Sequence, residues 1–428
     1  MKIALVNPNW NFEGSIYFGC RQPHLPLELG IASRMLRDAG HQVELIDGHL
    51  FGLSLADIAA EIRAFGPHML VVTTAPTYLF WRCAPPELRV PQELCHTLRE
   101  YAPLLVIVGP HGSTTPRTAL LKLGADVVVM GECEELLVRL ANDEREALDG
   151  LCYRDLGEIR IFGGPAATRF VNVPPIEWPA ETIARHRHHH HRFEADPVGP
   201  GAEVEASRGC PYSCTFCAKE NFRNRYRKRP PEAIISEVLR LMRQGVEYIY
   251  FIDEIFLPDA LLLEGLRGRG LKFGVQTRID LWKPEMLELL GRAGCVSIEC
   301  GVESLTAEGR DALEKRCKMT TDELADRLIE AKRHIAFVQA NLIEMPQDED
   351  DRVQRWRSQM RNAGIWANDP VPLFPYPGSP DYRKLWGLPD DQAWERAHEY
   401  YIAQFTTFSD VQNDRPRRLG ELECEVLP

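Results

Sequence analysis

Three cysteines stand within eight residues of one another in the segment SRGCPYSCTFCAKENFR (207–223), at Cys210, Cys214 and Cys217. Thiolates spaced this closely reach one metal centre only if the loop that carries them folds back on itself. Three ligands are one fewer than the four that close a structural zinc or iron–sulfur site. A 4Fe–4S cluster held by three cysteines therefore keeps one iron open to another molecule. The alternative is a zinc site completed by a distant histidine, although zinc sites usually show two paired Cys/His doublets.

The cysteine loop follows a strand-like segment, EVEAS, and precedes a regular alternation of helices and strands. Further strands are expected at 247–253, 272–278, 295–301, 336–346 and 371–377. Helical periodicity predicts helices at 231–244, 258–267, 284–293, 306–315, 321–334 and 349–363. Six βα units predict a partial (βα)6 TIM-type barrel, whose sites lie at the carboxyl ends of its strands.

The first 145 residues alternate in the same way. Val/Ile/Leu-rich strands are expected at 2–8, 42–47, 69–75, 104–110 and 126–131, with helices between them and after the last. Strands of this kind, connected by helices, predict a doubly wound, Rossmann-like parallel sheet. Ligands of such sheets sit beyond the carboxyl ends of the strands.

These patterns predict four parts of the chain. The first is a Rossmann-like domain over 1–148, and the second a small β piece with a His/Pro-rich connector over 149–202. The barrel follows over 203–380, and a helical C-terminal extension over 381–428. The run HRHHHHRF (186–193) in the connector leaves open metal binding, an inter-domain or substrate-facing role, or a solvated connector.

Composition limits the class of protein. The 428 residues are 44% apolar and 26% charged, and 50 basic against 62 acidic residues give a net charge of −12. An acidic chain of this kind is not expected to bind nucleic acid in general. No stretch approaches the length of a membrane span. Twelve cysteines without an export signal predict a reducing, cytoplasmic location.

The loop Cys-x-x-x-Cys-x-aromatic-Cys, placed after the first strand of a partial barrel, resembles that of the radical S-adenosylmethionine (SAM) enzymes. The resemblance implies a 4Fe–4S cluster whose open iron chelates the amino and carboxylate groups of SAM. An electron from a donor such as flavodoxin or ferredoxin then cleaves SAM, and the resulting 5′-deoxyadenosyl radical abstracts hydrogen from a small-molecule substrate. Arg208 and the basic run 219–229 are expected to offset the cluster's charge, or to form a solvated loop face.

Strand-end segments further along the chain resemble those of the same family. FIDEIF, QTRID, GVES, LIEMP and PYPGSP follow successive expected strands, although glycine is usual where Glu344 stands. For each single residue a local cap or salt bridge is the alternative to cofactor contact. The SAM-binding residues that the resemblance implies are Phe216, Asp253, Glu254, Arg278, Glu303 and Ser304.

A doubly wound domain placed before such a barrel resembles the cobalamin-binding domain of cobalamin-dependent radical SAM proteins. LPLELGIASRMLRDAGHQVELID and VGPHGSTTPRTALLKLGADVVVMGECEELL carry this resemblance. Small residues are expected to let the backbone approach the corrin and its nucleotide tail. The implied cobalamin-binding residues are Asn9, Asp47, Thr74, Gly109, His111, Gly112, Gly131 and Glu132.

The resemblance implies methyl transfer to an unactivated carbon, with one SAM remethylating cobalt and another generating the radical. Relatives with the same domains carry out oxidative cyclisation or ring rearrangement without net methylation, and the residues do not select between these reactions. A non-enzymatic cobalamin or redox sensor is the alternative from another class. It has no need of an open cluster iron.

The segment IDGHLFG contains Asp47-x-His49-x-x-Gly52, which matches the D-x-H-x-x-G motif that presents a histidine to cobalt. In proteins that use this motif it follows the first strand of the domain, whereas here it follows the second. We therefore expect cobalamin to bind without His49 as a cobalt ligand.

Two further features have simple explanations. Cys295 and Cys300 lie five residues apart on one expected strand, so we expect them on opposite faces as buried core thiols. An auxiliary cluster that also uses Cys317 is the alternative. The aromatic segment 394–408 is expected to form a helix over the barrel mouth.

Overall fold

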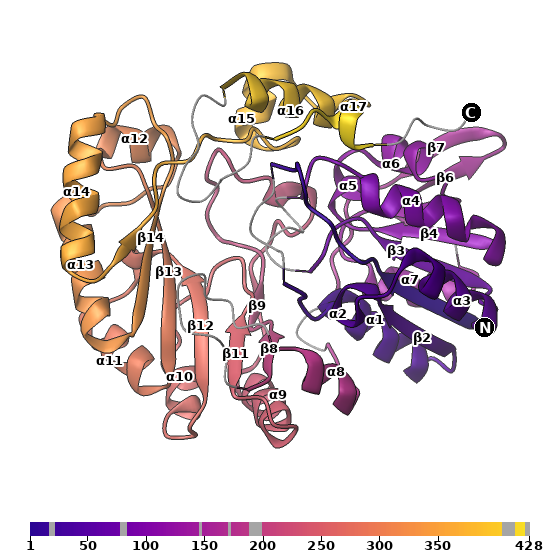
Figure 1. Cartoon of the computed structure of the whole chain (residues 1–428), viewed down its shortest axis with the longest axis horizontal. Helices are drawn as coiled ribbons and strands as arrows, with labels where there is room; N and C mark the ends of the chain where they lie inside the picture. Colours follow the sequence, from indigo (N-terminus) through magenta and orange to yellow (C-terminus); the bar gives the residue numbers. More distant parts are fainter. Residues whose placement is uncertain are drawn as a thin grey trace.

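A computed structural model describes residues 1–16, 22–77, 84–144, 148–169, 173–187, 199–404 and 416–423. The chain folds around two separate sheets, one of seven strands and one of six. Figure 1 shows the N-terminal sheet and its helices on one side, the second sheet on the other, and the segment around β8 and β9 between them. The α/β fold class predicted from the sequence is confirmed.

The N-terminal sheet has the strand order β2-β1-β3-β4-β5-β6-β7. Its first five strands are parallel: β1 (Lys2–Asn7), β2 (Gln42–Asp47), β3 (Met69–Thr73), β4 (Leu104–Val108) and β5 (Val127–Val129). The hairpin of β6 (Leu151–Asp155) and β7 (Glu158–Phe162) continues the sheet antiparallel. The small β piece that we expected after residue 148 is therefore part of this sheet.

Helices cover both faces of this sheet, as its strands of buried Val, Ile and Leu require. One core packs α1 (Leu27–Asp38) and α7 (Glu134–Ala141) against the sheet. The opposite core contains α3 (Leu55–Phe65), α4 (Arg89–Leu98) and α6 (Pro116–Lys122). Short helices stand at strand ends: α2 (Gly48–Phe51), α5 (Pro110–Thr114) and the 3₁₀ turn Arg99–Tyr101.

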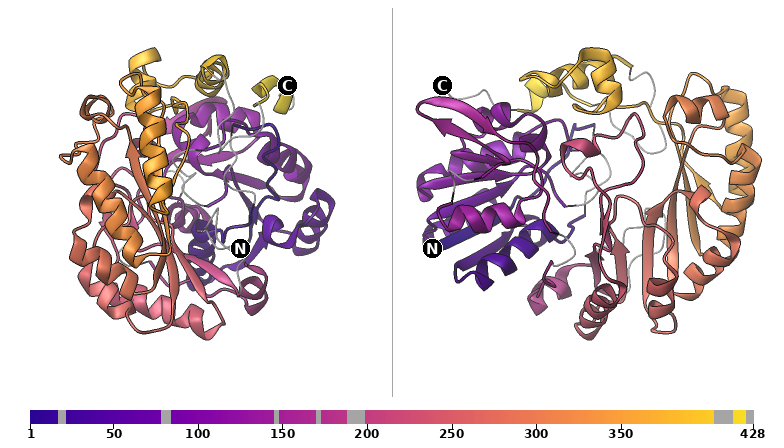
Figure 2. Two further views of the ribbon diagram at one scale, coloured as in Figure 1. Left: turned by 60° about the vertical axis from the view of Figure 1, so that its left-hand side comes forward. Right: turned by 180° about the vertical axis from the view of Figure 1, so that it is seen from behind.

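The second sheet is a parallel, open barrel with the order β15-β14-β13-β12-β11-β8. Its strands are β8 (Gly201–Val204), β11 (Tyr248–Phe251), β12 (Lys272–Thr277), β13 (Cys295–Glu303), β14 (Phe337–Leu342) and β15 (Trp366–Ala367). The helices that follow them lie on the outer side (Figure 2). They are α9 (Pro231–Arg243), α10 (Ala260–Leu266), α11 (Pro284–Arg292), α12 (Ala307–Ala312), α13 (Thr321–His334) and α14 (Asp350–Asn362).

The sixth barrel strand lies earlier than predicted. We expected it at 371–377, but β15 follows α14 directly, and the expected segment contributes only an isolated bridge from Val371 to Ile343. The reason is the repeated proline of that segment, PVPLFPYP. Proline has no N–H to donate to a sheet ladder.

Several short segments complete the fold. The connector forms α8 (Ala180–Arg185), and β9 (Ser207–Arg208) pairs with β10 (Arg227–Lys228) around the cysteine loop. Single 3₁₀ turns stand at Lys219–Asn221 and Ile279–Leu281, and the C-terminal extension contains α15 (Pro380–Trp386), α16 (Ala393–Gln404) and α17 (Leu419–Leu422). In the described part of the chain, no helix has the length and apolar character needed to cross a membrane.

The C-terminal extension lies across the top of both units (Figure 1). We had expected its helix over the mouth of the barrel, and the structure shows that it contacts the N-terminal unit as well. Trp394 Nε1 donates a hydrogen bond to Thr115 Oγ1 of the N-terminal unit at 3.1 Å. Lys122 of α6 forms an ion pair with Glu395 at 2.6 Å. The apolar side of α16 packs on Ala75 of the first unit as well as on Phe374 of the second.

Candidate functional site

The cysteine loop is held from several directions. Gly209 has a φ of +79°, and a Cβ there would lie 2.2 Å from the carbonyl oxygen of Arg225, so the loop requires glycine. The Gly209 N–H donates to Glu254 Oε2 at 2.7 Å, and Lys219 Nζ donates to the Cys210 carbonyl oxygen at 2.7 Å. Thr215 Oγ1 donates to Asp381 Oδ2 at 3.1 Å, which ties the loop to the start of α15.

One cavity brings the three cysteines together with the carboxyl ends of the barrel strands. Four of the six residues expected to bind SAM lie in its wall: Phe216, Glu254, Arg278 and Glu303. The remaining lining residues are Cys210, Tyr212, Cys214, Cys217, Ile255, Gln276, Thr277, Gly301, Lys315 and Asn341. Thiols, two cations, two carboxylates and two side-chain amides suit a cluster with a zwitterionic ligand beside it.

The other two expected SAM contacts, Asp253 and Ser304, are not in the cavity wall. Asp253 is buried and accepts hydrogen bonds from the Ala206 N–H at 2.7 Å and from Ser207 Oγ at 2.5 Å. Burial raises the pKa of Asp253 well above its usual value. Ser304 is fully buried and its hydroxyl donates to Asp348 Oδ1 at 2.9 Å. Both residues therefore organise strand-end loops, which is the local role that the sequence left open.

Sequence reasoning missed several residues of the wall. Lys315 follows α12 and reaches back to β13, and Gln276 and Asn341 project from β12 and β14. Tyr212, between the first two cysteines, lies under the Arg278 guanidinium at 4.1 Å. An aromatic residue inside the cysteine motif was visible in the sequence, whereas the approach of Lys315 depends on a turn that no local pattern specifies.

The cysteines do not form a ready mononuclear site. Within the described ranges, no three His, Cys, Asp or Glu side chains are arranged to hold a single metal ion.

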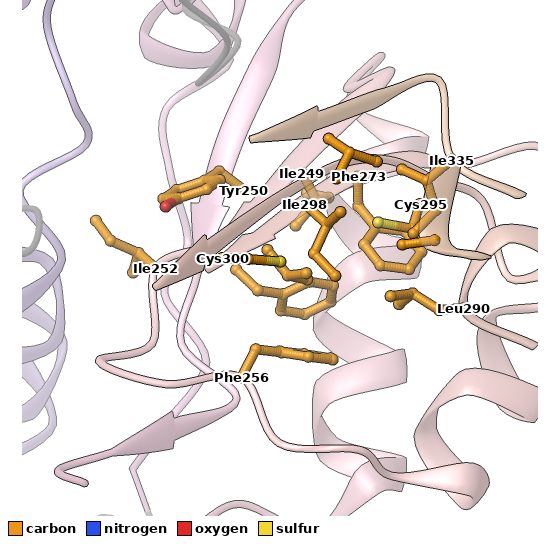
Figure 3. Packing of buried hydrophobic residues seen from close by; sticks show 14 of the residues in the cluster. Ile249, Tyr250, Ile252, Phe256, Phe273, Leu290, Cys295, Ile298, Cys300 and Ile335 are labelled. Carbon is orange, nitrogen blue, oxygen red and sulfur yellow. The ribbon is translucent and has the colours of Figure 1, made fainter. Parts of the chain in front are cut away.

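Cys295 and Cys300 are core residues. Both belong to one hydrophobic cluster, and Figure 3 shows them among Ile298, Leu290 and Phe256. Our expectation that they point to opposite faces is wrong, because the register of β13 against β12 shifts between Cys295 and Ser297. Cys317 is half-buried and packs against the same cluster.

Glu132, which follows β5 and was expected to contact cobalamin, is part of an ion-pair network between the two units. Glu132 is fully buried, and its carboxylate accepts from Arg208 Nη1 at 3.3 Å and from Arg227 Nη1 at 3.0 Å. Burial opposes ionisation of Glu132, but the guanidinium groups of Arg208, Arg227 and Arg223 outweigh it and lower the pKa to about 2. Arg208 also pairs with Glu134 at 2.7 Å. This network accounts for the basic run 219–229 better than a solvated loop face or the cluster's charge does.

Arg223 extends the network from the cysteine cavity into the first unit. Its guanidinium contacts Glu254 of the cavity wall at 3.1 Å and Glu28 of α1 at 3.1 Å. Glu205 at the end of β8 pairs with the same guanidinium at 2.7 Å. Glu28 also accepts a short hydrogen bond from Thr77 Oγ1, and burial raises its pKa to about 7.

The carboxyl edge of the N-terminal sheet carries buried polar atoms that the described residues leave unpartnered. Asp47 Oδ1 accepts from Asn7 Nδ2 at 2.8 Å and from the Leu50 N–H at 3.1 Å, while its Oδ2 has no such partner there. Burial raises the pKa of Asp47 to about 6. Thr74 Oγ1 is likewise unpartnered within the described ranges, and a Cβ on Gly109 would lie 2.4 Å from it. Buried acceptors without partners suit a ligand rich in amide N–H groups, such as the expected corrin.

Four other expected cobalamin contacts have local explanations. His111 is fully buried and lies against Trp394 in a tilted arrangement with the ring centroids 4.6 Å apart, and burial lowers its pKa to about 3. A Cβ on Gly112 would meet Val128 at 2.5 Å, and one on Gly131 would meet the Ala166 carbonyl oxygen at 2.3 Å. These two glycines therefore allow close packing, Gly112 against Val128 of the sheet and Gly131 against the backbone of Ala166. Asn9 is exposed, and its amide donates to the Leu53 carbonyl oxygen at 3.0 Å.

The structure also describes His49 and the first histidine of the connector run, His186. His49 is half-buried in α2, and burial lowers its pKa to about 4. His186 is buried, with Nδ1 2.6 Å from the Gly201 carbonyl oxygen and Nε2 3.3 Å from Glu203 Oε2. Glu203 also accepts from the Leu25 N–H at 3.1 Å, which favours an inter-domain role for His186. The histidines at 188–191 lie outside the described residues.

Comparison with known families supports both halves of the chain. Residues 204–356 match the radical SAM superfamily, and residues 20–141 match the B12 binding domain. An uncharacterized methyltransferase of Pyrococcus horikoshii is 25% identical over 90% of this chain and 82% of its own length. The hopanoid C-3 methylase of Methylococcus capsulatus is 27% identical over 87% of this chain and 71% of its own length. The anaerobic magnesium-protoporphyrin IX monomethyl ester cyclase of Cereibacter sphaeroides is 27% identical over 77% of this chain and 55% of the cyclase.

Solved structures share the whole architecture. The radical SAM methyltransferase TsrM of Kitasatospora setae, solved with cobalamin and a [4Fe-4S] cluster, superposes with a TM-score of 0.67 at 20% identity, covering 89% of this chain and 76% of TsrM. The cobalamin-dependent SAM radical enzyme OxsB gives 0.66 at 19% identity, covering 96% of this chain and 57% of OxsB. The chain carries a B12 binding domain followed by a radical SAM domain, and it belongs to the cobalamin-dependent radical SAM family.

Proposed function

We propose that this enzyme transfers a methyl group from SAM to an unactivated carbon of a small-molecule substrate. The cofactors of its family are SAM, a 4Fe–4S cluster and cobalamin, which together supply reductive cleavage of SAM and a transferable methyl group. Cys210, Cys214 and Cys217 would hold the cluster, because their thiols line one cavity at the carboxyl ends of the barrel strands. Thr74 and Asp47 would hold cobalamin through their unpartnered buried oxygens.

One observation carries the proposal: Arg223 joins the wall of the cysteine cavity to the B12 binding domain. It pairs with Glu254, which lines the cysteine cavity, and with Glu28 of the B12 binding domain. A methyl group that passes from one cofactor to a carbon radical formed beside the other requires both cofactors in a fixed relation. A buried guanidinium shared by both units supports such a fixed relation.

The cavity wall supports roles for further residues. Phe216 would shield the cluster from water, and Arg278, which pairs with Asp280 at 2.7 Å and lies over Tyr212, would place a cation beside SAM. The C-terminal extension, which bridges both units through α16, would close the substrate space from above. We assign residues 1–162 to the B12 binding unit, 201–380 to the radical SAM unit, and the segment after residue 380 to this closing extension.

Oxidative cyclisation is the second candidate, because the Cereibacter cyclase is as similar in sequence as the hopanoid methylase. The alignment with this chain covers 82% of the Pyrococcus methyltransferase and 71% of the hopanoid methylase, but only 55% of the cyclase. This difference in coverage supports methyl transfer over cyclisation. If this chain shares only the catalytic domains with the cyclase, the parts of the cyclase that serve its own substrate are expected to remain unmatched.

The experiment uses protein reconstituted anaerobically with iron, sulfide and hydroxocobalamin. It is incubated with methyl-deuterated SAM, a reductant and a small-molecule extract of cells from which the protein's gene has been deleted. Mass spectrometry then follows 5′-deoxyadenosine, S-adenosylhomocysteine and any extract component that gains the label. Methyl transfer predicts both SAM products and a labelled component, whereas cyclisation predicts 5′-deoxyadenosine without S-adenosylhomocysteine. A sensor predicts neither SAM product.

A further inference from the structure

The feature behind our inference is a row of four side chains on the barrel sheet, next to the cysteine cavity. Strand pairing places Gln276 of β12 beside Glu299 of β13, and Glu299 beside Gln339 of β14. Trp366 of β15 continues the row beyond Gln339. Residues paired in this way on neighbouring strands project from the same face of a sheet. The row therefore runs without a break across four strands.

The row faces the inner side of the barrel, because its members alternate with residues that line the cavity. Gln276 is itself part of the cavity wall. Gly301 and Asn341, which also line the cavity, stand two residues after Glu299 and Gln339 on the same strands. Alternate residues of a strand face the same side. Glu299 and Gln339 thus continue the polar wall of the cavity, one step nearer the amino ends of the strands.

The row is not packed into a hydrophobic core. All four of its side chains are half-buried, whereas Ile298 and Cys300 on the opposite face are fully buried in the core of Figure 3. One step further toward the amino ends, a Cβ on Gly274 would lie 2.2 Å from the hydroxyl oxygen of Tyr248. Tyr248 is 1% exposed, so its ring fills the interior there. The row is therefore the last polar level of the inner wall before the barrel closes.

The side chains of the row suit a ligand that donates hydrogen bonds. Glu299 contributes the single charged group of the row, a carboxylate, and a carboxylate only accepts. The side-chain oxygen of Gln276 on the next strand is buried and has no hydrogen-bond partner in the described part of the chain. Trp366 adds an indole ring at the end of the row, against which a carbon skeleton can pack. A negative charge beside an unused acceptor favours a protonated amine.

We propose that this row recognises the substrate and that the substrate is a small molecule with a protonated amine. Glu299 and Gln276 would accept N–H groups of the amine, and Trp366 would pack against the carbon skeleton. The inference rests on the proposed function, since it places the substrate beside the cavity in which the radical is expected to form. A purely apolar substrate would cover the Gln276 oxygen without a hydrogen bond, which is costly. A row that only braced the sheet would satisfy that oxygen from within.

The test is an affinity selection that needs no turnover. Protein reconstituted with iron, sulfide, hydroxocobalamin and SAM, but without a reductant, is mixed with the small-molecule extract of the gene-deleted cells and ultrafiltered. Mass spectrometry identifies the retained compounds. A second portion of the extract is first treated with acetic anhydride in aqueous bicarbonate, which converts primary amines to uncharged amides.

The variants are Glu299→Gln and Gln276→Met. The matched control is Glu308→Gln, which neutralises an exposed glutamate in the first turn of α12. Iron, corrin and SAM retained by each protein report whether its fold and its cofactor sites are intact. Gln276→Met decides the matter if Glu299→Gln fails to fold.

We expect the unaltered protein to retain a primary amine, and Glu308→Gln to retain the same compound to within about twofold. Glu299→Gln is expected to lower its retention roughly tenfold or more, because a charged acceptor is lost. Gln276→Met is expected to retain less of it than the control does. The acetylated extract is expected to yield no retained derivative of the compound.

A selection in which the unaltered protein retains no amine would overturn the inference. So would retention by Glu299→Gln, or from the acetylated extract, equal to that of the control. Failure of the proposed function has a different outcome: an amine is retained through Glu299, but it gains no labelled methyl group in the turnover assay. A labelled component that lacks an amine would instead contradict the inference and leave the proposed function intact.

Discussion

Glu132 of the B12 binding domain and Arg208 of the radical SAM domain form an ion pair, with 3.3 Å between Oε2 and Nη1, in which neither side chain is exposed to solvent. Arg208 precedes the first cysteine of the three-cysteine motif by two residues, and Glu132 follows the last parallel strand of the first sheet. Removing charges from water is costly, so buried pairs of this kind add little net stability. Such a pair instead fixes the position of one domain against the other, because a displacement of either domain would leave a buried charge unpaired.

Replacing Glu132 by Gln is expected to destabilise the protein by about 3 kcal/mol, because it leaves Arg208 and Arg227 without their shared carboxylate. Urea unfolding followed by tryptophan fluorescence measures the change. The control is Glu144→Gln, which breaks an exposed ion pair with Arg139 and is expected to cost less than about 1 kcal/mol. Equal effects of the two substitutions would show that the buried network has no special role.

Glu28 is expected to make stability fall as the pH rises. Burial raises its pKa to about 7 in the folded protein, from an ordinary value near 4.5. Between these values the folded state binds a proton that the unfolded state has released, so raising the pH through this range favours unfolding. Glu28→Gln removes that term, and its stability relative to the original protein is expected to improve by roughly 2–3 kcal/mol between pH 5 and pH 8. Parallel pH profiles for the two proteins would contradict this explanation.

The sequence predicted the parallel strands of the first sheet and five of the six barrel strands, because most of them are local apolar runs followed by a helix of matching length. It also predicted the cysteine motif and four wall residues, since each of them stands directly after a strand or within the motif. It could not predict that Glu132 faces Arg208, because that contact joins residues 76 positions apart across two domains. The position of Lys315 was hidden for a similar reason, since it depends on left-handed backbone at Glu314 and Arg316.

The three motif cysteines and the core cysteines are expected to behave differently on substitution. Cys214→Ala removes a thiol from the cavity wall and is expected to abolish reductive SAM cleavage. Cys300→Ala removes a fully buried core thiol and is expected to lower stability by about 1–2 kcal/mol while iron content and SAM cleavage persist. Iron analysis and 5′-deoxyadenosine formation measure both outcomes. Loss of iron in Cys300→Ala would support the alternative that this cysteine binds an auxiliary cluster.

His49→Ala is expected to leave the absorption spectrum of bound cobalamin unchanged. His49 follows the second strand, lies in the short helix α2, and is kept neutral by burial, which lowers its pKa to about 4. The spectrum with and without the substitution, recorded on protein loaded with hydroxocobalamin, is the measurement. A clear loss of axial nitrogen coordination in the variant would show that His49 ligates cobalt.

The product analysis of the reconstituted enzyme tests the central claim most directly. With cluster, hydroxocobalamin, reductant and methyl-deuterated SAM, our account predicts bound corrin, 5′-deoxyadenosine, S-adenosylhomocysteine and a small molecule that carries the deuterated methyl group. Failure to bind corrin, or SAM cleavage that persists in Cys214→Ala, would contradict the account.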